Sequence, residues 1–261
     1  MLVAQLSDPH IVEAGEWMLG AVDTAAALAR AVEHVNSLRD RPDLVLLTGD
    51  LVNDGLPSQY EHLGSLLAPL EVPFWLLPGN HDHTATLQKA FPDDVPGRDG
   101  RADGVREGDV RIVALDSTRF PEPGGTLDEE QLHWLHEVLA EAPRTPTLVA
   151  LHHPPFESGL RFMDTMRLDL GATERLEAVI GRHPHVERVL CGHLHRGMSR
   201  RFGGTIVMSC PGSAHSLELS FSDAPTQWNQ EPSSLLLHRW TPTAGLVTHT
   251  QVIGRFEPRS Y

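Results

Sequence analysis

Short apolar runs alternate along this chain with longer segments in which apolar residues recur at helical spacing. Apolar runs of about four to eight residues are typical of buried strands. The expected strands span 2–7, 44–48, 74–77, 110–115, 147–151, 186–190 and 205–210. The expected helices between them span 23–39, 58–70, 126–141 and 173–182. Such alternation of strands and helices predicts a layered α/β fold.

Local signals refine this pattern. Ser58-Gln-Tyr-Glu61 and Thr126-Leu-Asp-Glu129 have the form of capping boxes and predict two helix starts. Residues 92–108 are rich in Gly, Asp and Arg without periodicity, which indicates a surface loop. Near the end of the chain, the strand-like runs 234–240 and 246–253 are joined by Thr-Pro-Thr-Ala-Gly, a sequence typical of a hairpin connection.

Composition narrows the class of protein. A chain of 261 residues, with 40% hydrophobic and 21% charged residues, is typical of one large globular domain or of one domain with a modest appendage. The formal charge of −14 argues against a polymeric nucleic acid as partner, because no basic cluster is present to follow a phosphate backbone. The chain is rich in histidine, with 16 residues, several of them close to Asp or Asn.

Targeting signals are not evident in this sequence. The first residues lack a basic segment followed by an apolar one, so we expect no secretory signal. No stretch approaches the roughly 20 apolar residues of a membrane span, so no membrane partner is expected. Cys191 and Cys210 are too few for a disulfide framework. We therefore expect a reduced, cytoplasmic setting.

The segment 43–55 is the centre of the predicted site. Its apolar run 44–48 is followed by Gly49 and then by Asp50, where the strand ends. Ligands of open α/β sheets bind beyond the carboxyl ends of the strands. A carboxylate at that position can use its two oxygens on two cations, and we expect Asp50 to bridge two metal ions.

Other expected strands also end in residues that can bind metals. One such pair or single residue alone is a weak signal, because polar strand ends are common. Five of them in order, each at the end of an expected strand, indicate a metal centre. Oxygen and imidazole ligands without thiolate suit two divalent ions such as Mn, Fe, Zn or Co. These strand ends carry Asp8 and His10, Asp50, Asn80 and His81, His152, and His193 and His195.

These motifs resemble those of the calcineurin-like metallophosphoesterases. The resemblance covers about residues 2–215. The motif spacing and the loop sequences are most similar to those of the bacterial branch that contains class III cyclic nucleotide phosphodiesterases and glycerophosphodiesterases. The resemblance implies a four-layer αββα sandwich with two mixed β-sheets. We expect a catalytic domain over 1–215, followed by a C-terminal extension, 216–261, whose two strand-like runs complete the second sheet. The matching motifs are Asp8-x-His10, Gly49-Asp50, Gly79-Asn80-His81-Asp82, His152 and Gly192-His193-x-His195.

The resemblance further implies how the ligands divide. Asp8, His10 and His195 would hold one metal, and Asn80, His152 and His193 the other, with Asp50 shared. A hydroxide bridging two such metals would attack phosphorus. His81 would be catalytic and face the phosphate, where it stabilises the transition state or protonates the leaving group. The alternative for His81 is a histidine paired with Asp82 behind the ligands.

Three further residues are candidates for binding substrate. The protein Ser/Thr phosphatases have Gly-Asp-x-Val-Asp-Arg-Gly at the second motif, whereas this chain has Asn53 in place of the Asp that would orient the catalytic histidine, and lacks the Arg. The amide of Asn53 could bind a substrate oxygen or close a turn. Phe156 could line a lip of the site or pack in the core, and His215 matches a substrate-facing position of the resembling enzymes. His153 follows a ligand along the chain and is expected to point away from the site in a structural role.

The sequence therefore predicts a metal-dependent phosphodiesterase for a small-molecule phosphodiester. A 3′,5′-cyclic nucleotide is the first choice, glycerophosphodiesters are the alternative, and a phosphomonoester is the third. A non-catalytic interaction module on the same fold is the competing class, and the complete ligand set argues against it. The segment 216–231 could be a flap near the site or an oligomer contact, and a homo-oligomer is expected.

Overall fold

Two large mixed sheets form the centre of the computed structural model, which describes residues 1–222, 225–257 and 259. The first sheet has the order β13-β12-β1-β2-β3, in which β1, β2 and β3 are parallel and β12 and β13 antiparallel. Its strands are β1 (Leu2–Leu6), β2 (Leu44–Thr48), β3 (Phe74–Leu77), β12 (Ser234–Thr241) and β13 (Gly245–Val252).

The second sheet has the order β4-β5-β6-β7-β9-β8, with its four middle strands parallel and both edge strands antiparallel. Its strands are β4 (Gly104–Arg106), β5 (Arg111–Ala114), β6 (Thr147–Ala150), β7 (Val186–Cys191), β8 (Met198–Phe202) and β9 (Thr205–Ser209). A separate two-stranded ribbon pairs β10 (Ser216–Leu217) with β11 (Trp228–Asn229).

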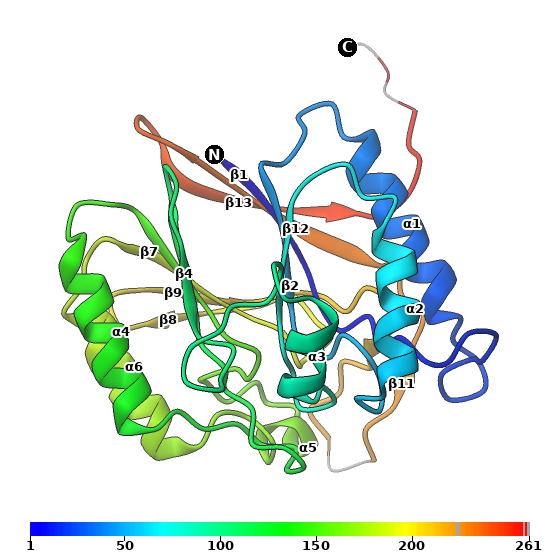
Figure 1. Cartoon of the computed structure of the whole chain (residues 1–261), viewed down its shortest axis with the longest axis horizontal. Helices are drawn as coiled ribbons and strands as arrows, with labels where there is room; N and C mark the ends of the chain where they lie inside the picture. Colours follow the sequence, from blue (N-terminus) through cyan, green and yellow to red (C-terminus); the bar gives the residue numbers. More distant parts are fainter. Residues whose placement is uncertain (223–224, 258, 260–261) are drawn as a thin grey trace.

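Helices cover the outer face of each sheet (Figure 1). On the first sheet lie α1 (Thr24–Ser37), α2 (Pro57–Leu67) and α3 (Thr84–Ala90). On the second lie α4 (Glu129–Glu141) and α6 (Leu170–Gly181), and the short α5 (Arg161–Asp164) precedes α6. In the part of the chain that the structure describes, no helix has the length and apolar character needed to cross a membrane.

Three apolar clusters hold these layers together. One lies between the sheets, where Leu46 and Trp75 of the first meet Ile112 and Leu190 of the second. The other two lie between each sheet and its own helices. Burial of this apolar surface on both faces of each sheet is the main stabilising contribution. The predicted four-layer αββα sandwich is confirmed.

Both predicted capping boxes are wrong in detail. The helix expected from Ser58 begins at Pro57, and its N-cap, Leu56, makes no side-chain cap. Proline suits the first helical turn because that turn leaves the amide nitrogens without helical partners. The hydroxyl of Ser58 instead donates to Glu13. In α4 the cap is Asp128, two residues after the expected Thr126, and it forms a capping box with Gln131.

Short or polar elements escaped the sequence analysis, because they show no apolar run or period. The expected loop 92–108 contains the strand β4, which hydrogen-bonds to β5. The helices α3 and α5, the strand β8 and the β10–β11 ribbon were also not predicted. The helix expected from 173 begins at Leu170, because Asp169 caps it by accepting a hydrogen bond from the amide of Ala172.

The C-terminal strands extend the first sheet. The strand β12 pairs with β1, and β13 forms the edge. Both therefore belong to the sheet of β1, β2 and β3, and not to the sheet that contains β4 to β9. The boundary at 215 stays a prediction, and positions 223–224, 258 and 260–261 of the expected extension lie outside the described residues.

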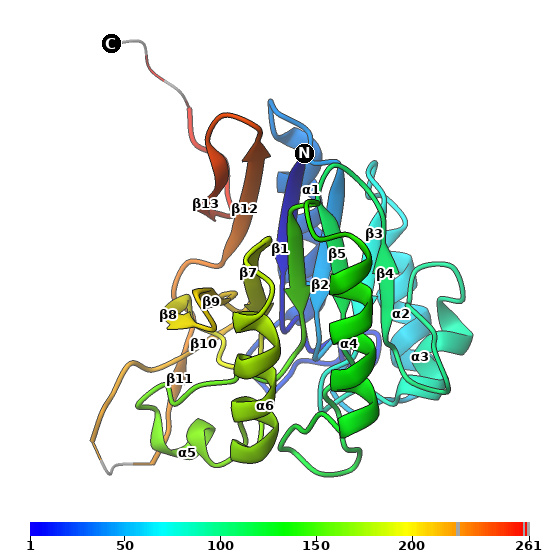
Figure 2. The same cartoon turned by 90° about the vertical axis from the view of Figure 1, so that its left-hand side faces the viewer.

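Five strands of the two sheets end at the same edge of the sandwich. The loops after β1, β2, β3, β6 and β7 meet there. Within each sheet, the amide of His10 donates to the carbonyl of Asp50, and that of Gly192 to the carbonyl of His152. Between the sheets, the amide of His193 donates to the carboxylate of Asp8. In Figures 1 and 2 this edge is the lower end of the molecule, where α5 also lies.

Candidate metal centre

The loops after five strands bring the predicted ligands together. Ligand atoms of Asp8, His10, Asp50 and His195 all lie within 4.8 Å of one another, and these side chains are buried. The carboxyl ends of parallel strands meet at one edge of a sheet. Because the two sheets pack face to face, their edges supply one common site. Asp and His residues able to bind metal ions therefore converge here.

The backbone at this site adopts an unusual conformation. Of the seven non-glycine residues with positive φ in the described part of the chain, five are predicted ligands. Left-handed backbone costs about 1–2 kcal/mol for residues other than glycine. Such strain gathers at functional sites, where surrounding structure enforces it. The five residues are Asp8 (54°), His10 (45°), Asp50 (49°), His193 (69°) and His195 (51°).

Two glycines allow the ligand loops to approach one another. A Cβ at Gly79 would lie 2.2 Å from Oδ1 of Asp50, and a Cβ at Gly192 would lie 2.1 Å from Oγ of Ser7. Both distances are far below van der Waals contact. The glycines of the Gly-Asn-His-Asp and Gly-His-x-His motifs are therefore required because the neighbouring loop occupies the space of a side chain.

Asp50 lies between two groups of side chains. Its Oδ2 is 3.5 Å from Nε2 of His10, whereas its Oδ1 is 3.4 Å from Nε2 of His152. The amide of His81 also donates to Oδ1 at 3.0 Å. The two oxygens of one carboxylate thus face two different sets of imidazole nitrogens.

The first set contains His10, His195 and Asp8. The Nε2 atoms of His10 and His195 are 3.1 Å apart, and Nε2 of His195 is 3.5 Å from Oδ1 of Asp8. The amide of His193 donates to both oxygens of Asp8, at 3.0 and 3.2 Å, and so holds this carboxylate in place.

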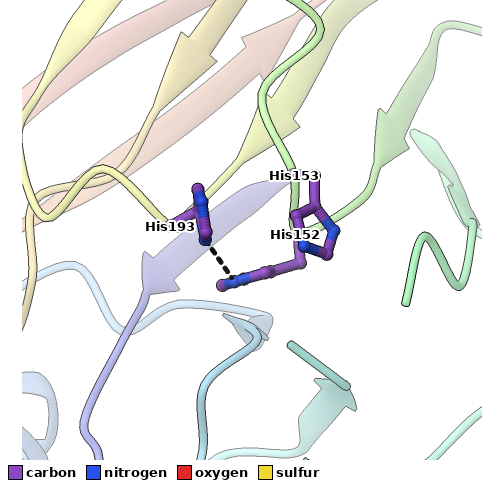
Figure 3. Close-up of side chains that lie close together, drawn as sticks. All are labelled: His152, His153 and His193. Atoms are coloured by element: carbon purple, nitrogen blue, oxygen red, sulfur yellow. Dashed lines mark hydrogen bonds between the residues drawn. The ribbon is translucent and has the colours of Figure 1, made fainter. Parts of the chain in front are cut away.

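The second set contains His152, His193 and Asn80. Nε2 of His152 lies 3.2 Å from Nδ1 of His193 (Figure 3). The same Nε2 lies 3.2 Å from Oδ1 of Asn80. The other ring nitrogen of His152 donates to the carbonyl of Thr48 at 2.8 Å, which orients the ring and turns Nε2 toward these atoms. Nε2 of His152, Nδ1 of His193 and Oδ1 of Asn80 therefore lie close together and could bind one metal ion.

Burial sets the charge of the imidazoles. It lowers the pKa of His10 and of His193 to about 3 and that of His195 well below its usual range. These rings are therefore neutral at pH 7, the state in which imidazole binds metals. Burial also acts to lower the pKa of His152, but the carboxylate of Asp50 outweighs it and raises that pKa to about 9.

The carboxylates carry the negative charge of the site. Burial acts to raise the pKa of Asp50, yet His152 and other imidazoles hold it well below the usual range, so Asp50 stays ionised. Burial raises the pKa of Asp8 to about 7. The two carboxyl groups and the neutral imidazoles of His10, His193 and His195 form a donor set that fits divalent cations. His152 and Asp8 would join it by releasing their protons, as ligands do when a metal binds.

His153 was expected to point away from the site, and that expectation is wrong. Its ring centroid lies 5.0 Å from that of His193 (Figure 3). The alternation of side chains does not apply, because β6 ends at Ala150. Both ring nitrogens have other partners, Oγ of Ser117 at 2.9 Å and the carbonyl of Pro123 at 3.2 Å. These bonds support the structural role that the sequence suggested.

His81 lies beside the first set without joining it. Its ring stands edge-on to that of His10, with centroids 4.7 Å apart. Nδ1 of His81 donates to the backbone carbonyl of Asn53 at 2.7 Å, so the ring is oriented by main chain. The amide of the Asn53 side chain donates to Asp54 at 3.1 Å. Substrate binding by Asn53 stays a prediction.

Asp82 does not pair with His81, so the alternative role for His81 is not supported. The buried carboxylate of Asp82 instead accepts hydrogen bonds from the amides of Gly79 (2.8 Å), Leu51 (3.0 Å) and Val52 (3.3 Å) and from the hydroxyl of Tyr60 (3.1 Å). It thereby ties the loop after β2 to the loop after β3. The sequence analysis missed this role, although the position of Asp82 within its motif was a signal.

The two remaining candidates differ in position. His215 is 4% exposed, and its ring centroid lies 4.3 Å from that of His195 and 5.7 Å from that of His10. The structure thus brings His215 to the site. Phe156 is 3% exposed and belongs to the apolar cluster of the second sheet. The packing alternative accounts for Phe156, and its contact with substrate stays an untested prediction.

Comparison with known proteins agrees with this geometry. Residues 1–197 match the model of the calcineurin-like phosphoesterases. A probable glycerophosphodiester phosphodiesterase GpdQ of Arcobacter nitrofigilis is 35% identical over 260 residues, which cover 98% of this chain and 95% of the relative. A 3′,5′-cyclic adenosine monophosphate phosphodiesterase CpdA of Escherichia coli K12 is 32% identical over 212 residues, covering 81% and 75% respectively.

A solved structure supports the fold. A dimetal phosphatase from Danio rerio superposes with a TM-score of 0.65 at 18% identity, covering 97% of this chain and 99% of that one. Identity at this level bears on architecture alone, whereas the family model covers most of the chain. The protein therefore belongs to the calcineurin-like phosphoesterase family.

Proposed function

We propose that this enzyme hydrolyses small phosphodiesters at a centre of two divalent metal ions. The observation that carries the proposal is the position of Asp50, whose two oxygens face two separate sets of ligand atoms 3.4–3.5 Å away. One set is Asp8, His10 and His195, and the other is Asn80, His152 and His193, the division that the family resemblance implies. Two metals held by these residues would acidify a water molecule and stabilise charge on phosphoryl oxygens.

His81 is the proposed general acid for the leaving group. The carbonyl of Asn53 holds its Nδ1 at 2.7 Å, so Nε2 is the nitrogen left for substrate. Burial acts to lower the pKa of His81, but the carboxylate of Asp50 and the Asn53 carbonyl outweigh it, and the pKa is raised. A raised pKa favours the protonated imidazole, which can give its proton to a departing alkoxide oxygen.

A 3′,5′-cyclic nucleotide is the first proposed substrate, as for the relative named CpdA. A glycerophosphodiester is the second, favoured by one observation: the relatives named GpdQ match 98% and 92% of this chain, including part or all of the region after residue 215. Asn53 and His215 are the proposed substrate-binding residues. Mn, Fe, Zn and Co remain the candidate metals, because availability as well as ligand type decides occupancy.

The setting proposed for this activity is the cytoplasm, because both cysteines are free thiols. Self-association is proposed as well, on the resemblance alone.

The test is a substrate panel on metal-free protein reconstituted separately with Mn, Fe, Co and Zn. Cyclic AMP, glycerophosphoethanolamine, bis(p-nitrophenyl) phosphate and p-nitrophenyl phosphate are compared at equal enzyme concentration. Turnover of the diesters above that of the monoester is expected with at least one metal. Cleavage of the monoester alone would overturn the diesterase assignment, and tight metal binding without any turnover would favour an interaction module.

A further inference from the structure

The β10–β11 ribbon borders the metal centre although it pairs with neither large sheet. Its two strands align Ser216 with Asn229 and Leu217 with Trp228. Both views of the molecule place β11 at the lower end, together with α5 (Figures 1 and 2). A two-stranded ribbon is marginally stable by itself, so its position depends on contacts with the rest of the fold.

One contact runs through His215, which directly precedes β10. The His215 ring lies 4.3 Å, between centroids, from the proposed ligand His195. The Trp228 ring stands edge-on to the His215 ring, with centroids 6.1 Å apart and ring planes at 85°. The Trp228 side chain is 38% exposed. An indole ring that is partly open to solvent therefore stands one side chain away from a ligand of the metal centre.

Arg196 supplies the second contact. It follows His195 directly, and its guanidinium donates to the carbonyl of Leu217 in β10. The same guanidinium pairs with Glu231, just after β11, at 3.2 Å. The Arg196 side chain is 17% exposed and that of Glu231 47% exposed, so solvent screens this pair in part. The loop that carries a ligand thus holds both strands of the ribbon.

We propose that Trp228 determines substrate specificity by stacking on a planar organic group of the phosphodiester, and that Arg196 positions Trp228. The inference rests on the proposed phosphodiesterase function and adds a preference for nucleobase or aryl groups over glycerol. Every nucleobase presents a flat π face, and stacking on an aromatic side chain is a common source of affinity. A glycerol group has no such face and gains little from an indole.

The first experiment compares Trp228→Ala with the wild type and with Phe221→Ala. Phe221 is a matched control because it is aromatic, 67% exposed and in the same segment, but it packs beside Gly159. For Trp228→Ala, we expect KM for cyclic AMP and bis(p-nitrophenyl) phosphate to rise about tenfold, the size of one lost stacking contact. The kcat values and the KM for glycerophosphoethanolamine stay unchanged, and Trp228→Phe restores most of the loss.

A second readout does not depend on turnover. Calorimetric titration of the metal-loaded protein with AMP and with glycerol phosphate measures the two affinities directly. Trp228→Ala should weaken AMP binding about tenfold and leave glycerol phosphate binding unchanged. Arg196→Ala should produce the same selective loss with unaltered metal content, and Arg196→Lys should recover part of it, because a lysine can keep one of the two contacts.

These outcomes separate the two ideas. Equal loss for planar and non-planar ligands would show that Trp228 is merely structural, and unchanged AMP affinity would show that it does not touch the ligand; either overturns the inference and leaves the phosphodiesterase function standing. An inactive wild type whose AMP binding still depends on Trp228 would overturn the proposed function and support the stacking site.

Discussion

The backbone carbonyl of Asn53, rather than its side chain, orients the imidazole of His81, at 2.7 Å from Nδ1. The protein Ser/Thr phosphatases have an aspartate at the position of Asn53, to which the resemblance assigned the orienting role. Here the main chain performs that role, and the Asn53 amide points to Asp54 instead. A mutation of Asn53 can therefore test the side chain separately from the main-chain carbonyl.

Asn53→Ala is expected to keep kcat near that of the wild type, since the substitution leaves the carbonyl in place. If the amide also binds a substrate oxygen, KM should rise about tenfold, which corresponds to the loss of one hydrogen bond. Steady-state kinetics with cyclic AMP measures both constants. A large fall in kcat would mean that the side chain takes part in orienting His81.

His81→Ala should slow hydrolysis about 10²- to 10⁴-fold, the usual contribution of a general acid. Metal content should stay at the wild-type value, because His81 belongs to neither ligand set. Inductively coupled plasma mass spectrometry of the dialysed variant measures its metal content. A variant that has lost metal would show that His81 is a ligand.

Asp50→Ala and Asp8→Ala should differ in metal stoichiometry. Asp50 faces both sets of ligands, so its loss is expected to weaken the binding of both metal ions and to abolish turnover. Asp8 faces only the first set, and its loss should leave one metal in the second. Equilibrium dialysis with Mn or Zn counts the ions in each variant. Equal stoichiometry in the two variants would contradict a shared role for Asp50.

Asp82→Ala should destabilise the fold by at least about 3 kcal/mol, because it leaves several buried donors without an acceptor. Tyr60→Phe should cost about 1–2 kcal/mol, since the Tyr60 hydroxyl also accepts from the amide of His83. Urea unfolding gives these values. Glu61→Gln, an exposed change on the same helix, is the control and should be neutral. A small effect of Asp82→Ala would show that the loops hold without it.

His238 should make the protein acid-sensitive. Burial lowers the pKa of His238 to about 3, and Arg188 acts in the same direction. Between the unfolded value of 6.5 and about 3, the unfolded chain binds a proton that the folded chain does not, so stability falls as pH falls. From pH 7 to pH 5 this group accounts for a loss of about 2 kcal/mol.

His238→Gln should reduce that loss. The variant should be less stable at pH 7 by about 1 kcal/mol, because the bonds to Gln5 and Thr248 are altered. Its stability should then decline less steeply between pH 7 and pH 5. Urea titrations at several pH values measure the two slopes. Parallel slopes would mean that His238 has the same pKa in the folded and the unfolded chain.

Much of this protein was predictable from sequence because its signals are local. The strands are apolar runs of ordinary length, and each ligand directly follows such a run, so β2 and Asp50 could be assigned together. The full set of motifs then indicated the layered sandwich. Helix starts were less certain: Pro57 and Asp128 begin α2 and α4, although other residues also had the form of caps.

Only the tertiary structure decided how these parts meet. The carbonyl of Asn53 contacts His81 from 28 positions away, and Asp82 collects donors from the loops after β2 and β3. Such bonds depend on backbone orientation, which side-chain patterns do not encode. The ribbon that carries Trp228 contains too few paired residues to show a period, and its place beside His215 follows from contacts made only after the two sheets have packed.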